Sequence, residues 1–332
     1  MKKIIALLLT LILAFGMLAS CGNDDDTQLK IGFMNGPTGL GMAELMATNG
    51  GLDGNEKYSF TKFENTNDAT AALISGKLDV VCLPTNEAAK VYNNEQTEID
   101  VQVLALNCLN SLFVVAKNGI NINSFADLEG KTVLTCKNGT PKIILDKLIS
   151  EYGINVTVVT EFFDEKENKM QTVLTPQDLP KVIKTNKADI VVAPEPIVTN
   201  ALMNNKDYSV KIDLGAAWDA KFDTPVAMGC ILARKDFIGE HESVVKNFLK
   251  EYKGSIEFMS NPENLDTAAQ YAVDATIMGA VPAAKKAIDN LGSAIAYVDG
   301  KDMKNTLVNV YKVFGNPVIG GKLPGDDFYY GS

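Results

Sequence analysis

From Leu29 onward, strand-like apolar runs alternate with helical patterns, and this alternation predicts an α/β fold with a largely parallel sheet. The first unit is an apolar run over Leu29–Met34, a turn rich in glycine and proline, and a helix for which Thr38 is the expected cap. Little side chain stands above that helix start, so its free N–H groups can meet another molecule. We expect one wall of a ligand cleft here, made by Asn35, Gly36, Pro37, Thr38 and Gly39.

A weak internal repeat predicts a second unit of similar build. Lys77-Leu-Asp-Val-Val-Cys-Leu-Pro84 and Lys187-Ala-Asp-Ile-Val-Val-Ala-Pro194 lie 110 positions apart and share four of eight residues. In both copies a helical pattern precedes a strand, and a proline at the end of the strand leads into another helix. We therefore expect two lobes, each offering the carboxyl end of a strand to a shared crevice, where open α/β sheets bind ligands.

Other candidate ligand contacts occupy the positions that this arrangement places at the crevice. Asn138-Gly-Thr-Pro141 opens a helix that ends before Gly153, which predicts a second wall of bare backbone. Each candidate also has a purely structural interpretation: it could cap a helix, place a favourable charge at a helix start or pack in the core. The further candidates are Thr85, Asn86, Asn110, Ser111, Asn138, Gly139, Thr140, Glu195 and Trp218.

Three longer segments carry additional expectations. The apolar run Val101–Lys117 has a polar interruption at Asn107–Ser111, which suggests one long strand crossing between the lobes with Asn110 and Ser111 at the crossing. Pro225–Ala233 suggests the crossing back. Glu161–Met170 is charged and is expected to be an exposed connection. From Glu240 the pattern is helical to the end of the chain.

The first residues indicate export. Lys2 and Lys3 precede the apolar run Ile4–Leu18, which is shorter than a transmembrane helix requires. The ending Leu18-Ala-Ser-Cys21 resembles the bacterial lipoprotein box, which implies cleavage before Cys21 and lipid on that cysteine. Residues 1–20 are then a signal peptide and residues 21–27 a polar tether. We expect an extracytoplasmic protein, lipid-anchored to the bacterial cell membrane.

The charge balance argues against nucleic acid as a partner. The 332 residues include 31 basic and 41 acidic ones. Cleavage removes Lys2 and Lys3 and no acidic residue, which leaves 29 basic and 41 acidic residues. Nucleic-acid-binding domains are usually basic, so a chain this acidic fits a different kind of partner.

Neither a cofactor, a metal nor a catalytic group is indicated. The glycine-rich turn after Met34 matches neither a P-loop nor a GxGxxG fingerprint. Cys82, Cys108, Cys136 and Cys230 lie in apolar runs without CxxC spacing, so buried reduced thiols are expected, although a Cys82–Cys108 bridge remains open. The single histidine, His241, lies between two glutamates and is expected on the surface. The chain is therefore not expected to be an enzyme.

The scarcity of arginine bears on the ligand. Arg234 is the only arginine, and it follows the second crossing, where it is not expected to reach the cleft. Sites for sulfonate, nitrate or dicarboxylate usually use arginine or lysine. Anion binding would rely on helix N-termini, hydroxyls and Lys137 or Lys142, and a neutral or amine-bearing heterocycle facing Glu195 is an equal alternative.

Several segments together resemble a known family. They are the turn after Met34, Ser124-Phe-Ala-Asp-Leu-Glu-Gly-Lys-Thr-Val133, Asn138-Gly-Thr-Pro141 and Ala193-Pro-Glu-Pro196, where Pro194 replaces the usual tryptophan. The chain resembles the ABC-transporter substrate-binding proteins of the nitrate, sulfonate, taurine and thiamine-precursor group.

This resemblance implies a two-lobed type II periplasmic-binding-protein fold, with mixed, mostly parallel sheets and two crossover hinge strands. Residues 28–110 plus 228–332 would form lobe 1 and residues 111–227 lobe 2. A small solute, such as a sulfonate or a pyrimidine thiamine precursor, would bind between the lobes of a monomer and pass to an ABC permease and its ATPase.

Two other functions are weighed against this one. The same fold serves enzymes of thiamine-pyrimidine or menaquinone synthesis, but those relatives lack a lipoprotein export signal. A ligand-sensing surface lipoprotein is the other alternative. A neighbouring permease gene would favour transport, and a neighbouring histidine kinase gene would favour sensing.

Overall fold

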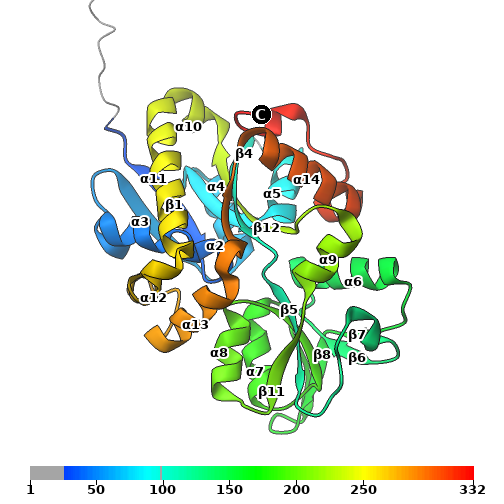
Figure 1. Ribbon diagram of the computed structural model, residues 1–332. Coiled ribbons are helices and arrows are strands. Elements are labelled where there is room, and N and C mark those ends of the chain that lie inside the picture. Colours follow the sequence, from blue (N-terminus) through cyan, green and yellow to red (C-terminus); the bar gives the residue numbers. More distant parts are fainter. Residues whose placement is uncertain (1–25, 98) are drawn as a thin grey trace, which may run out of the picture.

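The structure is a computed structural model that describes residues 26–97 and 99–332 (Figure 1). Cys21 and the predicted signal peptide lie outside the described residues. Two β-sheets organise the chain, one in the upper half of Figure 1 and one in the lower half. Helices flank both sheets, which confirms the α/β class predicted from the alternating pattern.

The first sheet has six strands in the order β13-β4-β12-β3-β1-β2. Strand β1 pairs in parallel with β2 and β3, whereas β12 runs antiparallel to β3 and β4. This mixture confines the parallel part to one side of the sheet. The strands are β1 (Leu29–Met34), β2 (Tyr58–Phe63), β3 (Val80–Pro84), β4 (Val101–Leu109), β12 (Ala227–Arg234) and β13 (Ile295–Val298).

The second sheet repeats this plan in the order β11-β5-β10-β6-β7. Strand β10 lies between a parallel neighbour, β6, and an antiparallel one, β5, just as β3 lies between β1 and β12. The two copies of the sequence repeat therefore occupy equivalent places. The strands are β5 (Leu112–Lys117), β6 (Thr132–Leu134), β7 (Thr157–Val159), β10 (Ile190–Pro194) and β11 (Tyr208–Asp213).

Helices from the two ends of the chain cover the first sheet, and helices from its middle cover the second (Figure 1). The first group is α2 (Pro37–Leu40), α3 (Ala43–Thr48), α4 (Thr66–Ile74), α5 (Thr85–Asn93), α10 (Lys235–Glu240), α11 (Glu242–Ser260), α12 (Leu265–Asp274), α13 (Val281–Leu291) and α14 (Gly300–Phe314). The second group is α6 (Thr140–Tyr152), α7 (Leu179–Lys184), α8 (Ile197–Asn204) and α9 (Leu214–Phe222).

Two short crossings join the sheets. Strand β4 ends at Leu109 in the first sheet and β5 begins at Leu112 in the second, so the predicted single long strand is two strands. The second crossing runs from α9 to β12. Asn110 ties the two together, because its N–H donates to the Val226 carbonyl at 3.1 Å and its Oδ1 accepts from the Val226 N–H at 2.7 Å.

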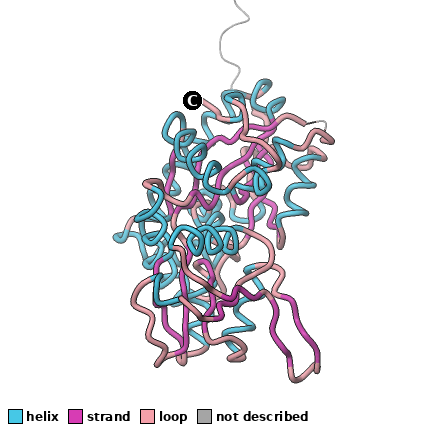
Figure 2. The backbone as a smooth tube through the Cα atoms, turned by 90° about the vertical axis from the view of Figure 1, so that its right-hand side faces the viewer, coloured by secondary structure: helices cyan, strands magenta, loops and turns pink. Residues whose placement is uncertain are grey.

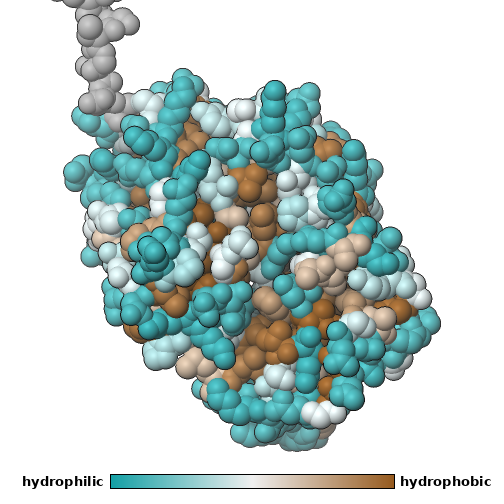
Figure 3. Space-filling view, viewed as in Figure 1, coloured by the Kyte–Doolittle hydropathy of each residue, from teal (hydrophilic) through white to brown (hydrophobic). Residues whose placement is uncertain are grey.

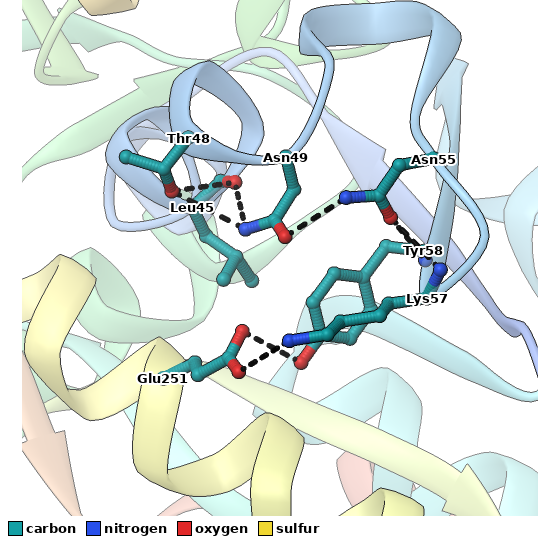
Figure 4. Close-up of polar contacts among 7 residues, drawn as sticks. All are labelled: Leu45, Thr48, Asn49, Asn55, Lys57, Tyr58 and Glu251. Carbon is teal, nitrogen blue, oxygen red and sulfur yellow. Dashed lines mark hydrogen bonds and ion pairs between the residues drawn. The ribbon is translucent and has the colours of Figure 1, made fainter. Parts of the chain in front are cut away.

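Side-chain hydrogen bonds brace the first sheet's outer edge, away from the crossings (Figure 4). Asn55 Nδ2 donates to Asn49 Oδ1 at 3.1 Å, which links the segment before β2 to the end of α3. The Tyr58 hydroxyl donates to Glu251 Oε2 at 2.9 Å, which links β2 to α11. These contacts hold the outer helices of this half to its sheet.

Two predicted segments differ from the structure. Glu161–Met170 is not a plain connection, because β8 (Glu161–Asp164) pairs antiparallel with β9 (Lys169–Thr172) in a hairpin that projects from the lower half in Figure 2. Phe162 is buried on one face of the hairpin, and exposed and buried residues alternate along β8. This short alternation within the charged run is typical of a strand. The chain after Glu240 is also not all helical, because β13 joins β4 at the edge of the first sheet.

The four cysteines in the described part of the chain, Cys82, Cys108, Cys136 and Cys230, are free. Cys82 lies on β3 and Cys108 on β4, and β12 runs between those strands, so the bridge left open by the sequence does not form. His241 is half-buried, and its ring centroid lies 4.7 Å from that of Phe237 rather than free in solvent. Among residues 26–97 and 99–332, no helix has both the length and the apolar character needed to cross a membrane.

Candidate functional site

A cavity of about 640 Å³ lies between the two halves of the molecule, at the carboxyl ends of β1, β2, β3 and β10. Most of the face in Figure 3 is hydrophilic, and its apolar atoms gather toward the middle, around the junction of the upper and lower parts. The first half lines the cavity with Met34–Thr38, Glu64–Asn67, Pro84, Asn86, Glu87, Lys90, Met228, Pro317 and Val318. The second half contributes Lys137–Ile143, Asp146, Thr175–Gln177, Pro194 and Ile197.

The turn after β1 forms part of the first wall, in a different way from that predicted. Gly36, at φ 132°, is the residue before α2, and Pro37 opens a helix of only four residues, so Thr38 is not the cap. The Gly39 and Leu40 N–H groups both donate to the Gly36 carbonyl, at 3.1 and 3.3 Å. Those two donors are therefore used within the turn.

Close packing fixes Thr38 from behind. Asn107 Nδ2 donates to the Thr38 carbonyl at 3.3 Å. A Cβ added to Gly229 would lie 2.2 Å from Thr38 Cγ2 and 2.6 Å from Asn107 Oδ1. Glycine at position 229 therefore lets β12 pass directly beneath the turn, and this is the close approach that a strand glycine commonly marks.

Three longer helices begin at the cavity. The first residues of α4, α5 and α6 all line it, through Thr66 and Asn67, Asn86 and Glu87, and Thr140 and Pro141. The first N–H groups of a helix have no partner within the helix, so helix starts favour a ligand's acceptor atoms or negative charge. At α4 one of these N–H groups already has a partner, because the Asn65 side chain accepts from the Asp68 N–H.

The second wall is held by the irregular segment that follows β9 (Lys169–Thr172). The Lys137 N–H donates to the Val173 carbonyl at 2.8 Å, and the Asn138 N–H donates to the Leu174 carbonyl at 3.0 Å. With their backbone fixed in this way, Lys137 and Asn138 expose their side chains at the cavity. Gly139, at φ 100°, then turns the chain into α6.

Charges around the cavity are nearly balanced. Lys90 pairs with Glu87 at 2.8 Å, and Lys142 pairs with Asp146 at 2.6 Å. Lys137 has no ion pair within the described part of the chain. Among the described residues that line the cavity, there is no aromatic side chain, histidine or arginine. Arg234 is absent from this lining, as expected from its position in the sequence, and it pairs with Asp236.

Eight of the fourteen predicted ligand contacts line the cavity together: Asn35, Gly36, Pro37, Thr38, Asn86, Asn138, Gly139 and Thr140. Two others lie behind the first wall. Gly39 packs against Met34, where an added Cβ would lie 2.3 Å from the carbonyl oxygen. Thr85 is fully buried, and its hydroxyl donates to the Ala227 carbonyl at 2.7 Å.

The remaining four lie at the junction of the two halves and are absent from the cavity lining. Asn110 ties the crossings, and Ser111 is fully buried beside Cys108. Trp218 is buried in the core, with its ring centroid 4.2 Å from Phe222 and 6.0 Å from Phe314 on α14. Core packing, the structural alternative for Trp218, is what the structure shows.

Glu195 is also committed to the protein itself. Its side chain is 1% exposed and accepts from the Thr199 N–H at 2.9 Å, the Thr199 hydroxyl at 2.8 Å and Asn290 Nδ2 at 2.9 Å. Burial raises the pKa of this carboxyl, and the hydrogen bonds and Lys286 partly oppose that rise. With these contacts made, Glu195 is a structural link between α8 and α13.

Several lining residues were not among the predicted contacts. Glu64–Asn67 follow β2, and the rule that ligands bind beyond strand ends would have found them. Thr175–Gln177 also line the cavity, where Thr175 caps a short 3₁₀ turn before α7. Pro317 and Val318 come from a short turn after α14 that no local pattern connects with the cleft.

Comparison with solved structures shows proteins of the same fold. The chain is 16% identical to an ABC transporter protein from Parabacteroides distasonis, with a TM-score of 0.72 over 92% of this chain and 99% of the other. The aliphatic sulphonate-binding protein SsuA from Escherichia coli gives 14% identity and a TM-score of 0.63, covering 86% and 87%. The nitrate-binding protein NrtA from Synechocystis PCC 6803 gives 14% and 0.58, covering 84% and 75%.

A family model agrees with this fold. No curated protein sequence matches the chain. The model described as NMT1/THI5 like matches residues 63–265, which include all of the second half and part of the first. With this match and the two-lobed periplasmic-binding-protein fold, the chain belongs to the NMT1/THI5-like family.

Proposed function

We propose that this protein is the solute-binding component of an ABC importer. It would hold a small organic molecule between two lobes, residues 28–110 plus 228–332 and residues 111–227, and deliver it to a permease and ATPase. The observation that carries the proposal is the cavity itself, whose two walls come from the two sheets. Its volume of about 640 Å³ lies within the range typical of small-molecule sites.

The connections between the halves suit a hinge. Two short crossings, tied by Asn110 and Val226, are a small number of residues in which backbone rotation could change the angle between the lobes. The named neighbours include sulphonate- and nitrate-binding proteins, which supports uptake of a small solute. We further propose export, cleavage before Cys21 and lipid anchoring outside the cytoplasmic membrane, with the protein acting as a monomer.

An enzymatic role has less support. Among the described residues, the cavity lining includes no histidine or cysteine that could act as a base or nucleophile. Burial raises the pKa of Cys82, Cys108 and Cys136 to about 12, so these thiols stay protonated and unreactive at neutral pH. The function is therefore better explained by binding than by catalysis.

Calorimetric titration of the protein lacking residues 1–20 tests the proposal, with sulfonates, amino acids, vitamins and pyrimidine precursors as probes. A true ligand should bind at one site per chain and raise the melting temperature by mass action. Asn138→Leu and Asn86→Leu should weaken that binding, and Asn305→Leu on the exposed face of α14 should not. If a ligand stabilises Asn138→Leu and Asn86→Leu as much as it stabilises the wild type, the cavity is not its binding site.

A further inference from the structure

Two amide oxygens on the first wall have no hydrogen-bond partner within the described residues. They are Asn35 Oδ1 and Asn86 Oδ1, and both have less than 1 Å² of accessible surface. Both residues line the cavity, and Asn86 as a whole is only 1% exposed. Leaving a buried acceptor without a donor is costly, and buried polar groups in native proteins are usually hydrogen-bonded. A bound ligand is therefore a candidate donor for these two oxygens.

The surroundings of Asn86 determine which way its amide is oriented. Its Nδ2 donates to Glu87 Oε1 at 2.8 Å, and the same oxygen accepts from Lys90 Nζ at 2.8 Å. The reverse orientation would place the amide oxygen against the carboxylate, acceptor against acceptor. The oxygen is therefore the free atom of the Asn86 amide, and it can only accept a hydrogen bond.

The opposite wall has the complementary character. The start of α6 presents Gly139 and Thr140, and Lys137 brings a positive charge without an ion pair among the described residues. Among the described residues, two carboxylates line the first wall, Glu64 and Glu87, and Asp146 lines the second; Glu87 pairs with Lys90 and Asp146 with Lys142. The unpaired acceptor oxygens of the cavity therefore lie on the first side, and its unpaired lysine lies on the second.

We infer that the cleft selects a small, non-aromatic molecule with an N–H donor group, held by Asn35 and Asn86, and an acidic group facing Lys137 and the start of α6. The inference rests on the proposed solute-binding function and specifies its ligand. An anion without a hydrogen to donate leaves both amide oxygens unpaired, and sites built to hydrogen-bond a group reject analogues that lack it. Among the described residues, the lining offers no aromatic face on which a pyrimidine could stack.

Matched pairs of probes test this choice by calorimetry. 2-Aminoethanesulfonate is compared with ethanesulfonate, and 3-aminopropanoate with propanoate, so that each pair differs only in the amine. Inorganic nitrate and a hydroxymethyl-aminopyrimidine complete the set. The amine-bearing member of at least one pair should bind at least about tenfold more tightly than its partner, and nitrate should bind weakly.

Asn86→Leu and Asn35→Leu separate this inference from general binding. Each should weaken the amine-bearing probe by about tenfold and leave its amine-free partner unchanged or tighter, because the variant removes an unpaired acceptor. Asn305→Leu on the exposed side of α14 is the matched control and should change neither. A melting curve checks that each variant is folded, and having two independent variants keeps the test valid if one is not.

The outcomes separate the two proposals. If amine-free partners bind as well as amine-bearing ones, or if Asn86→Leu weakens both equally, the donor requirement is wrong while solute binding stands. Tighter binding of the pyrimidine than of either amine-bearing acid also overturns the inference. If no probe or metabolite binds at all, the proposed function fails, and the inference fails with it.

Discussion

Glu195 Oε1 accepts a hydrogen bond from Asn290 Nδ2 at 2.9 Å, and this contact joins the turn before α8 in the second half to α13 of the first. The same Asn290 nitrogen lies 3.1 Å from the Thr199 hydroxyl oxygen. On another flank, Trp218 of α9 packs edge-on against Phe314 of α14. The two halves are therefore held together by side chains as well as by the two crossings, and any hinge motion must accommodate these contacts.

The Glu195 carboxyl gives a prediction for pH. Because burial raises its pKa in the folded protein above its unfolded value, the folded state binds a proton more readily than the unfolded state. The contribution of Glu195 to the free energy of unfolding is fully present below its pKa in the unfolded state. It is lost as pH rises through its pKa in the folded state. In urea denaturation, the free energy of unfolding of the wild type relative to Glu195→Gln should therefore fall as pH is raised from about 4 to 7.

Two variants control this experiment. Glu64→Gln changes a carboxyl whose side chain is 77% exposed, and it should shift stability little at any pH. Asn290→Leu removes one of the donors to Glu195 and should itself destabilise the protein by about 1 kcal/mol at neutral pH. If the difference in free energy of unfolding between wild type and Glu195→Gln stays constant across this pH range, the pKa of Glu195 is not raised in the folded protein.

Asn110 should be costly to replace. Its side chain accepts from the Val226 N–H at 2.7 Å and donates to Asp219 at 2.9 Å, and its backbone is left-handed at φ 41°. Asn110→Ala leaves the Val226 N–H without that acceptor and should lower the free energy of unfolding by about 1–3 kcal/mol. Urea denaturation measures the change.

Asn168→Ala is the matched control for that substitution. Asn168 also has a positive φ, of 50°, but lies in the exposed turn between β8 and β9. It reports the cost of alanine in left-handed backbone without the crossing contacts. Equal losses in the two variants would show that the hydrogen bonds to Val226 and Asp219 contribute nothing measurable.

Gly229→Ala should disturb the first wall of the cleft. The added Cβ would clash with Thr38 Cγ2 and with the Asn107 amide, so the turn after β1 must shift. We expect reduced stability, by about 1–3 kcal/mol, and weaker ligand binding. Gly254→Ala is the contrasting variant, since nothing lies within 4 Å of its Cβ on α11, and it should stabilise the helix by up to about 1 kcal/mol. Thermal melts and ligand titration measure both variants.

Cys21→Ala should release the protein from the membrane. If lipid on Cys21 is the anchor, the variant appears in the soluble fraction or stays as uncleaved precursor, and labelled fatty acid is not incorporated. Cys136→Ala changes a buried thiol and should leave fractionation unaltered. Membrane association that survives in Cys21→Ala would refute the lipid anchor.

The sequence alone established the elements with strong local signals. The apolar run placed β1 at Leu29–Met34, and the Thr140-Pro141 start and Gly153 stop bounded α6. The repeat located β3 and β10, and with them the strand ends where Asn86 and Pro194 line the cavity. These features follow from backbone preference and periodicity, which act over a few neighbouring residues.

Only the tertiary structure decided which candidates share the cavity and which hold the halves together. Asn86 and Glu195 follow equivalent strands, yet one lines the cleft and the other is enclosed by Thr199 and Asn290. Asn290 lies 95 residues from Glu195 in the chain. No local pattern encodes such a contact, because the choice between ligand site and structural link depends on which distant helix packs over each strand end.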